Sequence, residues 1–409
     1  MKPTSAFILA MTVLFPLNAA DWSRFRGENG TGHAAGDYPV TFDTTKNLAW
    51  KVKLPGLGHG SPIVVKDRVF LQVAKKDASA VSLVCIDVAK GDIEWSKGLD
   101  IKPGRFHKKN NMASSTPCSD GERVFTVFWD GDGLNLLAYD FKGTELWNKP
   151  LGKYASEHGA GHSPMTVDGL VIVNFDQDKK AELLAFDVKT GERKWSTPRE
   201  AHRASYTVPF LRSTGKDTKE LVVGSTTTLT AYNIATGKPN WEYKLKWPDG
   251  KLLRAIGQPV EADGHILLYT GEGGTGRYMV SVTPTTDGNA KLDWDTKKGT
   301  PYVPGAVVVK DHAYWIGDDG IAGCMNIATG KMAWSERLLA KGVSASPILL
   351  GDQLLVIGED GVCASFKATP TAMEKTSGAQ LGEAVFATPA AANGKLYVRG
   401  ADTLFCFKK

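Results

Sequence analysis

Five of the eight histidines in this chain lie in polar segments that lead up to a proline: His59, His107, His158, His162 and His202. Imidazole can ligate a metal ion or hydrogen-bond to an anion near neutral pH. A metal site built from His158 and His162 is disfavoured, because Gly159 and Gly161 between them oppose a helix and no carboxylate lies obviously nearby. We therefore predict no metal site.

Further polar side chains stand in the corresponding segments of the chain, and they are mainly cations and hydrogen-bonding groups: Asn110, Arg203, Tyr206, Arg254, Gln258 and Tyr302. If the segments converge, they form a polar, cation-rich site for an anionic small molecule or an acidic peptide. The alternative is that they are solvated loops in which His and Arg cap strand ends.

The elements that would position these residues are repeated hairpins. Segments such as LLAFDVKTGERKW, ending at Trp195, combine alternating apolar residues, Asp or Asn, a Gly-bearing turn and a Trp. The Asp or Asn accepts hydrogen bonds from turn amides, Gly permits a positive φ, and Trp docks against the next repeat. The predicted docking residues are Trp50, Trp95, Trp147, Trp195, Trp241, Trp294 and Trp334, with Met373 in the next slot.

A second unit precedes each hairpin, in which a small residue and Pro introduce an apolar strand, a polar turn and another strand. Its prolines, at positions 62, 117, 164, 209, 259, 304, 347 and 389, are 42 to 55 residues apart. Four short strands per such period predict an all-β protein, an eight-bladed β-propeller with four-stranded blades. The strand with Trp50 should pair with the C-terminal blade and close the ring.

This repeat resembles that of the pyrroloquinoline-quinone (PQQ) propeller superfamily, which includes quinoprotein alcohol dehydrogenases and BamB of the outer-membrane β-barrel assembly machinery. The start WSRFRGENGTG looks more like secreted PQQ-like propellers without an assigned role. The chain lacks the adjacent Cys pair and the C-x-x-C-H haem motif of the enzymes, and their calcium ligands and general base cannot be matched to its residues. It also lacks the lipidated Cys of BamB.

The N-terminal sequence predicts export. Residues 1–20 read as a signal peptide, 21–46 as an N-terminal extension and 47–409 as the propeller, with the mature chain beginning at Asp21. The five cysteines are predicted to be free, since Cys85, Cys324 and Cys406 occupy a position where other repeats carry Ala. A net charge of +5 with scattered Lys pairs argues against nucleic acid, and no later segment is long and apolar enough to span a membrane.

Two functions follow from these observations. The first is a periplasmic or secreted, monomeric, non-catalytic scaffold that binds envelope proteins or a small anionic ligand and carries no cofactor. The second is an alcohol or sugar dehydrogenase dependent on PQQ and calcium, which the resemblance implies. The missing dehydrogenase motifs favour the scaffold.

Overall fold

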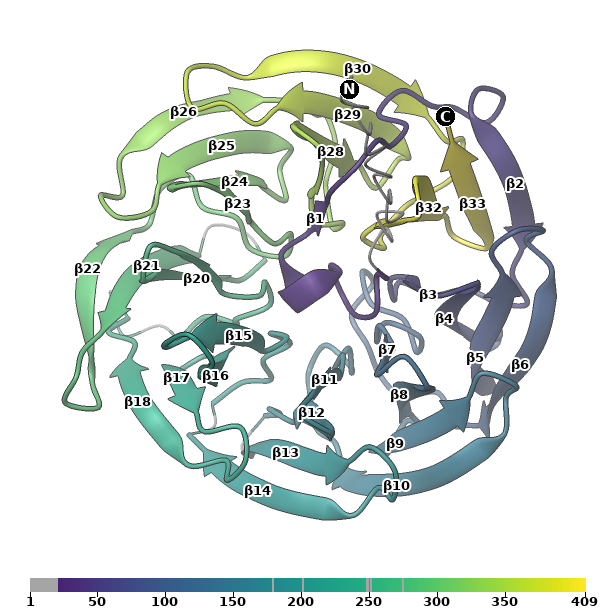
Figure 1. Ribbon diagram of the computed structural model, residues 1–409, viewed down its shortest axis with the longest axis horizontal. Helices are drawn as coiled ribbons and strands as arrows, with labels where there is room; N and C mark the ends of the chain where they lie inside the picture. Colours follow the sequence, from purple (N-terminus) through teal and green to yellow (C-terminus); the bar gives the residue numbers. More distant parts are fainter. Residues whose placement is uncertain (1–20, 179, 201, 248–249, 251, 274–275) are drawn as a thin grey trace, which may run out of the picture.

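A ring of eight β-sheets makes up the protein (Figure 1), as seen in a computed structural model that describes residues 21–178, 180–200, 202–247, 250, 252–273 and 276–409. The predicted signal peptide lies outside the described residues. Each blade has four antiparallel strands, named here from the axis outward. The predicted eight-bladed propeller is therefore confirmed.

The strands of the first four blades are β3 (Ile63–Val65), β4 (Arg68–Ala74), β5 (Ala80–Asp87), β6 (Ile93–Asp100); β7 (Cys118–Ser119), β8 (Arg123–Trp129), β9 (Gly133–Asp140), β10 (Glu145–Lys153); β11 (Met165–Val167), β12 (Leu170–Asn174), β13 (Ala181–Asp187), β14 (Arg193–Arg199); and β15 (Phe210–Ser213), β16 (Lys219–Gly224), β17 (Thr228–Tyr232), β18 (Pro239–Lys244). Those of the last four are β19 (Val260–Ala262), β20 (His265–Gly271), β21 (Arg277–Pro284), β22 (Ala290–Thr296); β23 (Val307–Val309), β24 (His312–Ile316), β25 (Ile321–Asn326), β26 (Met332–Arg337); β27 (Ile348–Leu350), β28 (Gln353–Ile357), β29 (Val362–Lys367), β30 (Glu374–Gln380); and β31 (Ala390–Ala392), β32 (Lys395–Arg399), β33 (Thr403–Lys408), β2 (Leu48–Lys53).

Strand β2 closes the ring, as the position of Trp50 predicted. It pairs antiparallel with β33, the last strand of the chain, and Trp50 lies opposite Cys406. The outermost strand of the eighth blade thus comes from the start of the propeller and its three inner strands from the end. This arrangement ties both ends of the ring into one sheet and leaves no blade incomplete.

The tryptophans dock each blade against the next one. The indole N–H of Trp147 donates to the Val188 carbonyl, 3.2 Å away in the turn of the following blade. A Cβ on the turn residue Gly191, whose φ is +64°, would lie 2.7 Å from that indole ring. Trp50, Trp95, Trp195, Trp294 and Trp334 donate to the next blade in the same way. The turn glycine therefore leaves room for the docking ring.

Two positions differ from this pattern. Trp241 shares an apolar cluster with Ile266 and Val280 of the next blade, but its N–H donates to Glu220 Oε1 in its own blade at 2.8 Å. Met373 does not occupy the Trp slot of the seventh blade. The register places Ser377 there, opposite Ser365, because the hairpin is two residues longer than in the sixth blade, where Cys324 faces Trp334.

The core consists of apolar layers between blades. The inner strands are almost fully buried, whereas most residues of outer strands such as β6 are exposed. All five cysteines are free and buried, as predicted, and Cys85, Cys324 and Cys406 each face a docking Trp across the sheet. Apolar packing between blades thus replaces disulfides as the cross-link.

Residues 21–46 cross the centre of the ring, where Figure 1 shows the purple N-terminal segment. A short 3₁₀ turn, η1 (Glu28–Gly30), is followed by β1 (His33–Ala34), which pairs parallel with β27. Trp22 bridges to Val64 of the first blade, and Phe42 is buried against Phe407. The extension is therefore part of the packed structure.

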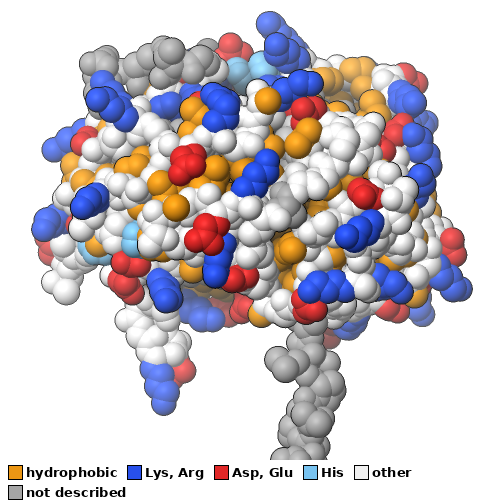
Figure 2. Space-filling view, turned by 90° about the horizontal axis from the view of Figure 1, so that it is seen from above, with side chains coloured by type: hydrophobic (Ala, Val, Ile, Leu, Met, Phe, Trp, Pro, Cys, Tyr) orange, Lys and Arg blue, Asp and Glu red, His pale blue; other side chains and the backbone are white. Residues whose placement is uncertain are grey.

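The outer wall carries no large patch of one charge on the side that Figure 2 shows, where Lys and Arg alternate with Asp and Glu. Among the described residues, no helix has the length and apolar character needed to cross a membrane.

Candidate functional site

The propeller has two different faces. Lead-in segments, which run from the outermost strand of one blade to the innermost strand of the next, share one face with the loops between second and third strands. Backbone hydrogen bonds join the two sets, such as those from Arg254 to Gly271 and from Val343 to Asp318. We call this the loop face. The extension lies on the opposite face, where Asp21 accepts a hydrogen bond from the Lys66 amide.

A cavity of about 130 Å³ lies on the axis and opens toward the loop face. Five buried hydroxyl residues, each in the position before a Pro, line it: Ser61, Thr116, Ser163, Ser346 and Thr388. Each hydroxyl oxygen accepts a backbone N–H from the neighbouring blade at 2.8 to 3.0 Å. The small residues that precede these prolines therefore link six successive blades.

The extension closes the other end of this cavity. Phe25 lines the cavity, and its neighbours Arg24 and Arg26 are buried beside the axis. Arg24 donates to the Pro209 carbonyl and Arg26 to the Ala306 carbonyl, each at 2.5 Å. Burial lowers the pKa of both guanidinium groups, that of Arg24 to about 10. The channel is thus a pocket with one opening.

A third buried arginine lies near the cavity mouth. Arg399 donates to the Gly60 carbonyl at 2.8 Å, and burial lowers its pKa to about 9. Next to it, His59 lines the cavity, stacks on Phe386 with ring centroids 4.3 Å apart and has Nδ1 3.1 Å from the Lys109 carbonyl. Burial, and then the charge of Arg399, lower the pKa of His59 to about 4.

The rim of the mouth differs from the predicted cation-rich site, because its basic groups have carboxylate partners. Arg254 lies 2.8 Å from Glu157 and Arg203 lies 3.9 Å from Glu272. Lys109 also reaches across the mouth to Glu359, with Nζ and Oε1 2.7 Å apart. The rim therefore presents paired charges of both signs.

Several predicted residues converge on one part of this rim. His107 is exposed and stacks on His158 with ring centroids 5.0 Å apart, and His158 Nε2 is 3.4 Å from an Arg254 nitrogen. Asn110 donates to the carbonyls of His158 and Ala160, which fixes the two lead-in segments to each other. Burial, followed by the charge of Arg254, lowers the pKa of His158.

Other predicted residues lie elsewhere. His162 is buried, with Nε2 3.0 Å from the Asp176 carbonyl, and burial lowers its pKa to about 4. Tyr206 lines the cavity and donates to the Gly159 carbonyl at 2.7 Å. His202 is exposed on the rim, and Tyr302 is buried under Arg277.

Gln258 does not lie at the mouth. Its Nε2 donates to the carbonyls of Asn29 and Gly30 at 3.1 and 3.3 Å, so it holds the extension on the opposite face. A Cβ at Gly30 would lie 2.1 Å from Gln258 Oε1. Because this contact joins residues 228 positions apart, the sequence carries no local signal for it.

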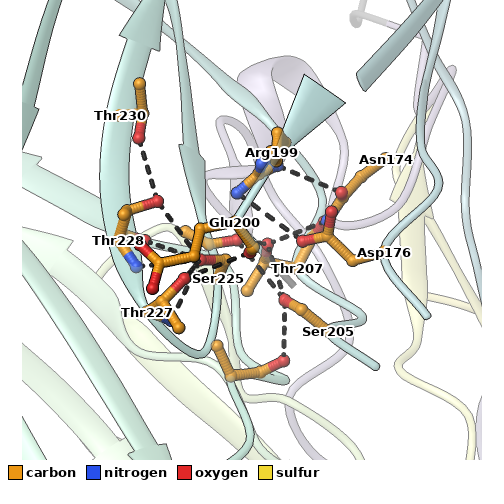
Figure 3. Close-up of polar contacts among 12 residues, drawn as sticks. Asn174, Asp176, Arg199, Glu200, Ser205, Thr207, Ser225, Thr227, Thr228 and Thr230 are labelled. Atoms are coloured by element: carbon orange, nitrogen blue, oxygen red, sulfur yellow. Dashed lines mark hydrogen bonds and ion pairs between the residues drawn. The ribbon is translucent and has the colours of Figure 1, made fainter. Parts of the chain in front are cut away.

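A buried polar cluster joins the third and fourth blades (Figure 3). Arg199 donates to Asn174 at 3.1 Å and lies 3.6 Å from Asp176, with both charged side chains at most 2% exposed. Thr207 and Ser205 bond to the Gly224 carbonyl on the other side of the junction. Burial raises the pKa of Asp176 to about 6, although Arg199 opposes the shift. Arg199 therefore lies next to a carboxylate that can balance its charge.

The described residues do not fit PQQ with calcium. PQQ is a flat tricarboxylate, whereas the axial cavity of about 130 Å³ is small for a cofactor and the rim guanidinium groups already pair with protein carboxylates. No group of three or more His, Cys, Asp or Glu side chains in the described part of the chain is arranged to hold a metal ion.

The chain is similar to known proteins over most of its length. Residues 83–336 match the family model described as outer membrane protein assembly factor BamB. A protein of that name from Burkholderia pseudomallei (strain K96243) is 26% identical over 357 residues, which cover 84% of this chain and 82% of that protein.

Two solved structures share the fold. The crystal structure of BamB from Moraxella catarrhalis has a TM-score of 0.65 at 16% identity, covering 88% of this chain and 99% of that one. The quinohemoprotein alcohol dehydrogenase from Comamonas testosteroni has a TM-score of 0.66 at 15% identity, covering 96% of this chain and 81% of that one.

Proposed function

We propose, because this chain belongs to the family of the outer membrane protein assembly factor BamB, that it is a non-catalytic scaffold that binds protein partners during the assembly of outer-membrane proteins. A periplasmic location, after removal of residues 1–20, and a monomeric state are parts of the same proposal. The poor fit to PQQ and calcium leaves the dehydrogenase alternative without supporting contacts.

The main reason for choosing this surface is the length of the lead-in segment at residues 101–117. It runs for 17 residues between β6 and β7 without a strand of its own, and such long loops in compact domains are usually functional. Phe106 on this segment is 37% exposed, although its ring also contacts Trp129 edge-on. An exposed aromatic ring held by a packed loop is suited to anchoring a protein partner.

The paired charges around this segment also suit a protein partner. Mixed charges at a rim select an oriented partner through complementary potentials without attracting every anion or cation nearby. His107 and His202 add exposed groups on the same face. We therefore assign the loop face around residues 101–117 as the partner-binding surface.

Capture of partners from envelope extract of the native organism tests this surface. We expect Phe106→Ser to reduce the captured partner roughly tenfold, as for loss of an aromatic anchor. Leu146→Ser is the matched control, since Leu146 is 44% exposed on β10, outside the loop face. Equal capture by the two variants, or normal outer-membrane protein levels after gene deletion, would contradict the proposal.

A further inference from the structure

The axial cavity combines donors that have no acceptor with charges that have no counter-charge. Each of the five lining hydroxyl oxygens accepts one backbone N–H, so its own hydrogen remains available to donate. None of these five hydroxyls donates a hydrogen bond to another described residue. Because all five line the same cavity, the ring offers several convergent donors to one occupant.

The charges around the cavity have the matching sign. Arg24, Arg26 and Arg399 are 6%, 0% and 1% exposed, and none has a carboxylate within ion-pair distance in the part of the chain that the structure describes. Nitrogen atoms of all three guanidinium groups are buried without a hydrogen-bond partner there. Guanidinium groups stay protonated in proteins, so the interior carries positive charge that the described residues do not balance.

Two of these arginines lie next to the ring of hydroxyls. Arg399 bonds to the carbonyl of Gly60, the residue before Ser61. Arg26 lies against Gly305, because a Cβ on Gly305 would be 2.5 Å from Arg26 Nη1. The amide of Gly305 in turn donates to Ser346. Glu359, the carboxylate at the mouth, already contacts Lys109 and Ser344.

We propose that the axial cavity is an anion-binding site that takes an oxyanion group of about the size of phosphate, held by the hydroxyls of Ser61, Thr116, Ser163, Ser346 and Thr388. The buried arginines supply the positive potential, which acts over several ångströms because the interior has a low dielectric constant. Phe25 closes the site below, so the anion enters and leaves through the loop face. Thr116 belongs both to the ring and to segment 101–117, but anion binding in the cavity does not require a partner on the loop face.

Calorimetric titration with inorganic phosphate in Tris-chloride buffer tests the site. The wild type should bind one phosphate per chain, with a rise in its unfolding midpoint. Thr388→Val should weaken binding roughly tenfold, since it removes one donor, whereas Thr388→Ser should keep it. Ser335→Ala, on the exposed outer strand β26, is the control that should bind like the wild type.

Additional arms identify the anion and locate it. Titrations with sulfate and acetate distinguish an inorganic tetrahedral anion from the carboxylate group of an organic one. Selenate soaked into crystals should give anomalous density inside the hydroxyl ring. The proposal is overturned if none of these anions binds at millimolar concentration, if Thr388→Val binds phosphate like the folded wild type, or if the selenate density lies outside the cavity.

Discussion

Two regions of the propeller bury arginine in different ways. At the junction of the third and fourth blades, Arg199 lies 3.6 Å from Asp176 in a polar cluster between the sheets (Figure 3). Along the axis, Arg24, Arg26 and Arg399 hydrogen-bond to main-chain carbonyls and have no carboxylate partner among the described residues. The charge of Arg199 is therefore balanced within the protein, whereas the three axial arginines carry positive charge that an anion in the proposed site would balance.

The largest expected effect comes from breaking the complete pair. Arg199→Met leaves Asp176 buried without its counter-charge, and loss of one partner of a buried pair costs about 3–5 kcal/mol. Urea denaturation at neutral pH measures this loss. A loss below about 1 kcal/mol would mean that Asp176 does not balance Arg199.

The pH dependence of the same pair is next in size. Burial raises the pKa of Asp176 to about 6 in the folded protein, from 3.8 in the exposed group. A raised carboxyl pKa favours the folded state at low pH, and this contribution disappears as the pH rises through about 6. Relative to Asp176→Asn, the wild type should therefore gain about 3 kcal/mol of unfolding free energy between pH 7 and pH 4. A constant difference across this range would refute the shift.

Removing an axial charge should have a smaller effect on folding. Arg399→Met removes a buried charge, and no carboxylate loses its partner. The substitution also removes the hydrogen bond to Gly60, but the folded protein no longer has to keep a guanidinium group out of water. In buffer without oxyanions, we expect unfolding free energy to change by about 2 kcal/mol or less. A loss as large as that of Arg199→Met would show that Arg399 is balanced by a protein group.

The smallest expected signal is the titration of His59, whose pKa is lowered to about 4 by burial and by Arg399. An anion in the cavity favours the imidazolium form, so phosphate should raise this pKa by about one unit or more. Phosphate binding should accordingly tighten as the pH falls toward the pKa. Proton NMR titration, with His59→Gln for assignment, measures the shift. An unchanged pKa at saturating phosphate would show that the bound anion does not interact with His59.

The fold could be predicted from the sequence because its signals are local. Each hairpin encodes its own turn through Asp or Asn and Gly, and Asp187, for example, accepts the amides of Lys189 and Thr190. The predicted register of the Trp slot was wrong in the seventh blade, where no Trp marks the slot and Ser377 takes the place expected for Met373.

The site was less predictable because it depends on contacts between distant parts of the chain. Arg26 reaches Ala306, 280 residues away, and no local pattern marks that contact. The sequence did carry one usable signal, since the charged Arg399 directly follows Leu396, Tyr397 and Val398 at the end of the inner strand β32. The structure places the predicted cations Arg203 and Arg254 on the loop face, but their carboxylate partners come from other loops.

Site-specific photo-crosslinking in the native envelope tests the proposed partner surface most directly. A photoreactive residue at position 106, on the lead-in segment, is compared with one at position 189, in an exposed turn of the opposite face. We predict a crosslink to a defined envelope protein from position 106 and none from position 189. Crosslinks of equal yield from both positions, or none from position 106, would contradict the assignment of the loop face as the partner-binding surface.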